Sequence, residues 1–134
     1  MKKIHILAAV LLCMALLFSG CGGNVRGAER VIGDSELYSP GEIRMAMEKA
    51  VALFDRNFDG CTLTEIVYDE AFSRARSEGW AEQYGADEAI VLYSSFRTGS
   101  QTQSLEPNSS YEKYQWILTR NRGSGWVLRT WGYG

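Results

Sequence analysis

The stretch SPGEIRMAMEKAVALFDRNF, residues 39–58, determines the fold that we predict for this chain. Ser39 precedes Pro40 and lies three residues before Glu42, the pattern of a capping box with proline at the first helical position. Apolar side chains then recur at intervals of three and four residues, which is typical of a helix with one buried face. The members of this face are Ile43, Ala46, Met47, Ala50, Leu53, Phe54 and Phe58. We therefore expect an amphipathic helix that ends near Asp59 and Gly60.

After this helix the chain is dominated by strand-forming residues. Residues 61–68 and 88–98 are rich in β-branched and aromatic side chains, and the second run is apolar on both faces, as in a central strand. Between them, Asp69 is expected to cap a second helix that reaches about Tyr84.

The last part of the chain predicts a hairpin. Residues 111–120 and 126–133 alternate as strands do, and they flank the glycine-containing connection 121–125. A polar loop, residues 99–110, precedes the hairpin. The expected fold is therefore α+β, with a long N-terminal helix packed on a curved antiparallel sheet of about four strands. This arrangement resembles the cystatin-like and NTF2-like folds.

The N-terminus has the features of a secretory signal. Lys2 and Lys3 precede an apolar run over residues 6–18, which is shorter than the roughly 20 residues of a membrane-spanning helix. Leu17-Phe18-Ser19-Gly20-Cys21 follows, and this segment resembles the lipobox of bacterial lipoproteins. The resemblance implies cleavage before Cys21 and a diacylglyceryl group on its sulfur. The alternative is an ordinary secreted protein, cleaved near Gly20, in which Cys21 is a passive thiol.

These features divide the chain into three parts: a lipoprotein signal peptide over 1–20, a flexible tether over 21–37, and a single α+β domain over 38–134. The tether is predicted from its polar, glycine-rich composition. Its one apolar pair, Val31 and Ile32, would also suit a short edge strand. We expect the protein to be held on the extracytoplasmic face of the cell membrane.

Cleavage before Cys21 would remove several reactive groups. His5 is the only histidine and lies in the signal, so the mature chain lacks the imidazole that Ser-His-Asp and Cys-His catalysis need. We predict no catalytic residue, no metal and no cofactor. Loss of Lys2 and Lys3 changes the formal net charge from −2 to −4, which gives no electrostatic case for binding nucleic acid. Cys61, which begins a strand, is interpreted as a core residue rather than a reactive thiol.

Several segments carry a further resemblance, to a group of small lipoproteins of Gram-positive gut bacteria. The resemblance covers most of residues 39–134 and implies location and fold, but no activity and no catalytic residue. The segments concerned are 58–65 (FDGCTLTE), 80–85 (WAEQYG), 87–96, 114–118 (YQWIL) and 126–134.

Three functions remain open. The first is a non-catalytic module that binds a small molecule or a protein, with pocket-lining candidates Tyr68, Tyr93, Trp116 and Trp131. The second is an enzyme of the NTF2-like type that uses carboxylates for acid–base chemistry, with candidates Asp69, Glu70, Asp87 and Glu88. The third is a protein inhibitor or assembly partner that acts through the 99–110 loop and the C-terminal residues 132–134.

Overall fold

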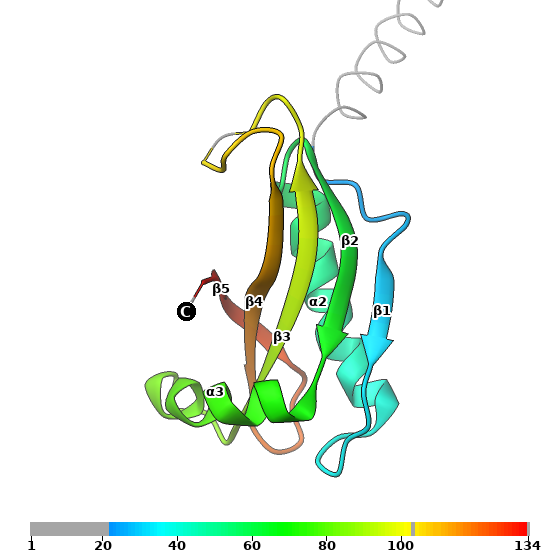
Figure 1. Ribbon diagram of the computed structural model, residues 1–134. Coiled ribbons are helices and arrows are strands. Elements are labelled where there is room, and N and C mark those ends of the chain that lie inside the picture. The colour runs from blue at the N-terminus through cyan, green and yellow to red at the C-terminus, as the bar shows by residue number, and fades with distance from the viewer. Residues whose placement is uncertain (1–21, 103, 134) are drawn as a thin grey trace, which may run out of the picture.

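The computed structural model describes residues 22–102 and 104–133. Cys21 and the predicted signal peptide lie outside the described residues. Five strands and two helices form this part of the chain (Figure 1). In chain order they are β1 (Glu29–Ile32), α2 (Pro40–Asn57), β2 (Cys61–Tyr68), α3 (Glu70–Gln83), β3 (Glu88–Thr98), β4 (Ser110–Arg120) and β5 (Val127–Gly132).

The strands form one sheet in the order of the sequence, β1-β2-β3-β4-β5. β1 runs parallel to β2, whereas every other neighbouring pair is antiparallel. Helix α2 lies along one face of the sheet, and α3 crosses the lower end of the opposite face in Figure 1. The sheet therefore separates a large core under α2 from a smaller contact under α3.

The predicted fold class is wrong. The sheet has five strands and is mixed, whereas the prediction was an antiparallel sheet of about four strands. Helix α2 has 18 residues and is shorter than the long N-terminal helix of the prediction. The difference arises from β1, a four-residue strand with one apolar pair. Its partner β2 is more than thirty residues away in the chain, so no local pattern could show the parallel pairing.

The capping box predicted at the start of α2 is present. The Ser39 hydroxyl accepts from the Glu42 N–H, and the Glu42 carboxylate accepts from the Ser39 N–H, so the capping box is complete. The apolar face of α2 is buried against aromatic and aliphatic side chains of the sheet. Phe54 is fully buried and contacts Phe58, Phe96 and Trp116, which places the densest aromatic packing near the end of the helix.

Helix α3 follows its predicted bounds, but it packs differently from the expectation. Asp69 stands at the N-cap without a side-chain cap bond, and Ser73 is the only residue of the helix that is buried. The Ser73 hydroxyl accepts from the Val91 N–H at 3.0 Å. The pairing of β2 with β3 ends at Val67 and Tyr93. The Val91 N–H of β3 therefore has no partner in β2, and Ser73 of α3 accepts its hydrogen bond instead.

A bulge in β4 brings two tyrosines to the same face. Ser94 lies opposite Tyr114, and Phe96 lies opposite Tyr111, so β4 has one extra residue between these pairs. Lys113, in this interval, has a φ of +53°. An extra residue reverses the alternation of a strand. Tyr111 and Tyr114 therefore both contact Phe96, with ring centroids 5.0 and 5.1 Å away.

The segment predicted as a flexible tether is part of the folded domain in its described residues, 22–37. The Gly23 N–H donates to the Asp55 carbonyl at 2.9 Å, and the Asn24 N–H donates to the Cys61 carbonyl at the same distance. Farther on, Val31 and Ile32 lie in β1. The glycines that suggested flexibility instead permit close packing: a Cβ on Gly23 would lie 2.6 Å from the Phe54 carbonyl oxygen and 2.8 Å from its ring.

The domain has a proximal and a distal end, which lie at opposite ends of the sheet in Figure 1. The proximal end, at the top of Figure 1, comprises residues 22–24, the α2–β2 connection 57–61 and the described residues of the β3–β4 connection 99–109. The distal end, at the bottom, comprises residues 35–42, the start of α3 at Glu70, the start of β3 at Glu88 and the end of β4 at Arg120.

Candidate functional site

A recess of about 180 Å³ lies at the proximal end. Three aromatic rings line it, and each comes from a different part of the fold: Phe58 follows α2, Tyr114 lies in β4 and Trp131 lies in β5. Its remaining lining residues are mostly polar and belong to the two connections at this end. They are Asn57, Asp59, Cys61, Thr102, Ser104 and Leu105.

The two connections that frame the recess are held together by their main chains. The Gly99 N–H donates to the Gly60 carbonyl at 2.8 Å, and the Asn108 N–H donates to the Gly99 carbonyl at 2.9 Å. Gly60 has a φ of +74°, and a Cβ there would lie 2.5 Å from the Gln101 carbonyl oxygen. Glycine is therefore required where the two connections touch.

Burial governs the ionisation of the groups around the recess. It raises the pKa of the Cys61 thiol, and the neighbouring Asp59 carboxylate raises it further. The pKa of Tyr114 is also raised, first by burial and then by Tyr133. Both groups are therefore neutral near pH 7, and Asp59 is the one acidic side chain among the recess residues that the structure describes. One oxygen of Asp59 accepts from the Gly22 N–H at 2.7 Å.

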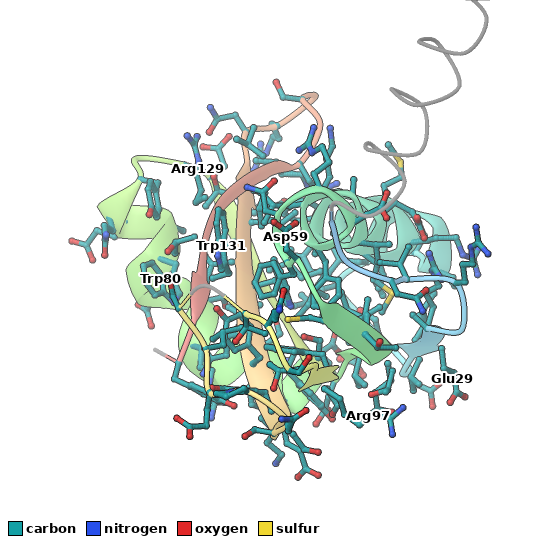
Figure 2. All side chains as sticks on the ribbon, turned by 90° about the horizontal axis from the view of Figure 1, so that it is seen from above. Glu29, Asp59, Trp80, Arg97, Arg129 and Trp131 are labelled. Atoms are coloured by element: carbon teal, nitrogen blue, oxygen red, sulfur yellow. The ribbon has the colours of Figure 1, made fainter. Side chains whose placement is uncertain are left out.

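Trp131 is the most exposed of the three rings, with 38% of its surface accessible. Figure 2 shows it between Trp80 of α3 and Asp59. It lines the recess on one side and a smaller cavity with Trp80 on the other. Its inner face stacks on Trp116 with ring centroids 6.0 Å apart. A firmly packed, partly exposed indole is the kind of surface on which a ring-shaped ligand stacks.

The other three pocket-lining candidates lie elsewhere. Tyr68 and Trp116 are each 1% exposed and belong to the core, where the Trp116 Nε1–H donates to the Ser94 hydroxyl at 2.8 Å. Tyr93 lies on the opposite face of the sheet, with its ring centroid 4.7 Å from that of Phe72 in α3. The structure therefore does not bring the four candidates together, and only Trp131 lines the recess.

The four candidate carboxylates lie at the distal end. Three of them make structural contacts there, and the fourth, Asp69, is exposed. Glu70 accepts from the Glu36 N–H at 3.0 Å, from the hydroxyl of Ser35 and from the hydroxyl of Tyr68 at 3.0 Å. These bonds, the Glu36 N–H first, lower the pKa of Glu70 to about 2. A general base needs a pKa near the working pH, so Glu70 is shifted in the wrong direction for that role.

Two of the other three carboxylates also make structural contacts. Glu88 pairs with the Arg120 guanidinium at 2.8 Å, and Asp87 accepts from the Arg122 N–H at 2.8 Å. Asp69 is exposed at the start of α3. No two of the four candidates face one another across the recess, which lies at the proximal end.

Sequence reasoning missed most of the residues of the recess. The sequence predicts Phe58 and Asp59 only as the end of a helix, and it indicates the 99–110 loop only as a contact surface for a protein partner. The signal in the sequence is that both segments are polar and contain a glycine, because two such connections at one end of a sheet often form a binding surface. The α2–β2 and β3–β4 connections do meet at one end of the sheet, since β2 begins beside the last residue of β3.

Comparison with protein-family models, with curated proteins and with solved structures gave no match to this chain. Within residues 22–102 and 104–133, no cluster of His, Cys, Asp and Glu side chains is placed to hold a metal ion. Across the same residues, neither helix is long and apolar enough to cross a membrane.

Proposed function

We propose that the protein is a lipoprotein, attached through Cys21 to the extracytoplasmic face of the cell membrane, and that it is a non-catalytic module that binds a small ligand in the proximal recess. The attachment is supported by the sequence of residues 17–21, which resembles a lipobox. The binding role is carried by one observation, the meeting of three aromatic rings and several polar side chains around a recess.

The size of the recess limits the ligand. Sites for drug-sized molecules have volumes of about 300–1,000 Å³, whereas this recess has about 180 Å³. It therefore suits a single small ring. Aromatic walls favour a ligand with a flat apolar face, and the Asp59 carboxylate and the Asn57 amide favour hydroxyl or amino donors at its edge. A monosaccharide unit has both properties.

A fluorescence titration tests the binding role. The soluble Cys21→Ser protein is titrated with a panel of monosaccharides and amino sugars, and tryptophan emission is followed. We expect saturable binding that Trp131→Leu weakens about tenfold, the equivalent of ~1.4 kcal/mol. Trp80→Leu is the matched control, because Trp80 lies on the other side of Trp131 and does not line the recess. Absence of saturable binding across the panel, or an equal loss in both variants, would refute the proposed role.

Fractionation tests the attachment. The wild-type protein should remain with membranes, and Cys21→Ser should be released into the soluble fraction. A Cys21→Ser protein that stays with membranes would contradict the proposed lipidation.

A further inference from the structure

We propose that the proximal end of the domain rests directly on the membrane surface, so that the recess is presented at the level of the lipid headgroups. The partner is the lipid bilayer to which the chain is attached. This inference rests on the proposed lipidation of Cys21. It adds the orientation of the domain, which lipidation alone does not determine.

The proposed attachment point is joined to the folded domain without a flexible linker. Cys21 is joined to Gly22 by one peptide bond, and consecutive Cα atoms are about 3.8 Å apart. Gly22 is already held, because its N–H donates to the Asp59 carboxylate at 2.7 Å. A flexible tether over residues 21–37 would instead have had a reach of roughly 20 Å and would have left the domain free to turn.

Residues 22–24 are held by packing as well as by hydrogen bonds. Asn24 bonds to β2 in both directions: its N–H donates to the Cys61 carbonyl, and its carbonyl accepts from the Leu63 N–H, each at 2.9 Å. Gly22 has a φ of +105°, and a Cβ there would overlap the Asp55 carbonyl oxygen. Residues 22–24 are therefore fitted closely against the end of α2 and the start of β2.

Surface charge does not explain an attraction of the proximal end to the bilayer. The exposed charges at this end and next to it are of both signs: Asp55, Asp59 and Glu106 are acidic, and Arg56 and Arg97 are basic. Attraction to anionic lipids requires a cluster of about 4–8 basic residues. The covalent attachment, rather than surface charge, therefore sets the orientation, and the domain without its lipid should not bind vesicles.

The orientation places the two ends of the domain at different heights. Helix α2 has 18 residues and runs from the distal end to the proximal end. At 1.5 Å per residue it is about 27 Å long. A probe at the distal end should therefore lie much farther from the headgroups than a probe at the proximal end.

Energy transfer to the membrane surface tests this inference. Lipidated protein is inserted into phosphatidylethanolamine–phosphatidylglycerol vesicles that contain a lipid with an acceptor dye on its headgroup. Single donor dyes are attached through Glu106→Cys at the proximal end or Ser124→Cys in the β4–β5 turn, both exposed positions. Cys61 is buried and should take up little dye, which the wild-type protein verifies. We expect strong quenching at position 106 and weak quenching at position 124.

A linker variant shows whether the short connection causes the difference. Ten glycine and serine residues inserted between Cys21 and Gly22 add a reach of about 17 Å. This insertion should remove most of the difference between the two probes. The same linker inserted between Gly123 and Ser124, in protein labelled at position 106, is the control and should leave the quenching unchanged.

The outcomes separate the orientation from the attachment. Equal quenching at positions 106 and 124, in protein whose N-terminal peptide carries a diacylglyceryl group by mass spectrometry, would overturn the orientation and leave the lipidation standing. A linker without effect would do the same. A peptide that lacks the lipid, with protein that does not remain on the vesicles, would refute the proposed attachment itself.

Discussion

The two ends of this domain are held by different kinds of interaction. At the distal end, charged side chains converge: Arg120 contacts Glu42 at 2.6 Å and Glu88 at 2.8 Å, and its guanidinium lies 4.2 Å from the ring centre of Trp126. The Glu70 carboxylate accepts hydrogen bonds from the Ser35 hydroxyl and the Glu36 N–H, which precede α2. At the proximal end, main-chain bonds and glycines dominate, and the recess lies among them.

This difference predicts what each end tolerates. The distal end should be sensitive to charge and pH, because its contacts are between ionised groups. The proximal end should be sensitive to volume, because its chains approach too closely for a side chain. Substitutions that change only one of these properties can therefore distinguish the ends.

The largest effect is expected for Gly23→Ala at the proximal end. The new Cβ would lie 2.6 Å from the Phe54 carbonyl oxygen and 2.8 Å from its ring, so the segment must move away from α2. We expect a loss of about 3 kcal/mol in the free energy of unfolding, the upper end of the usual cost of overpacking. Urea unfolding of the soluble domain measures it. Gly27→Ala is the matched control, because a Cβ there meets no atom within 4 Å. Similar losses in the two variants would contradict the close fit.

Arg120→Met should have the next largest effect and acts at the distal end. It removes hydrogen bonds to two carboxylates, which are worth about 1.5–3 kcal/mol for a charged group, and we expect a loss of about 2 kcal/mol. Arg30→Met removes an ion pair with Glu48 that is more exposed, at 31% and 51% for the two side chains. Such surface pairs contribute about 0–1 kcal/mol. Equal losses in these two variants would show that the distal network adds nothing beyond a surface pair.

The dependence of stability on acid should come partly from Glu70. Its pKa is lowered to about 2 in the folded protein. The contribution of its carboxylate is therefore complete above the unfolded pKa, about 4.5, and is lost as the pH falls from there toward 2. In Glu70→Gln the stability should decline less steeply across this window, measured by urea unfolding at pH 6 to pH 2. Glu78→Gln, on the exposed side of α3, should keep the wild-type slope.

The smallest change is expected in the reactivity of Cys61. Burial raises the pKa of this thiol, so less of it is thiolate at pH 8, and iodoacetamide has little access to it. In Cys21→Ser protein we expect slow alkylation in buffer and fast alkylation in urea. Fast alkylation of the folded protein would show that the recess exposes Cys61 more than its 2% accessibility indicates.

Local signals explain why much of the fold could be predicted. The capping box of Ser39 and Glu42 specifies the start of α2, and the apolar period specifies its buried face. Residues 61–68 and 88–98 are predicted as the strands β2 and β3 because strand-forming residues occur along their whole length. The antiparallel pairing of β4 with β5 followed from a short connection with glycine.

The rest depended on contacts between distant residues. Gly22 and Gly23 were interpreted as signs of flexibility, but the same residue type also serves close packing, and only the position of Phe54 distinguishes the two uses. The recess required two connections to meet, and a bulge in β4 moved Tyr111 to the face of Tyr114. Neither follows from periodicity, because each depends on the register between strands.

The short edge strand β1 has a consequence for the proposed arrangement on a membrane. Molecules attached and oriented as proposed would approach one another sideways, and an open sheet edge would allow them to pair into a continuous sheet. β1 covers the long strand β2 with only four residues, of which Glu29 is exposed and Arg30 is paired with Glu48. At the other edge, β5 has six residues, an irregular register and the exposed Arg129. Both edges of the sheet would therefore disfavour edge-to-edge pairing between neighbouring molecules.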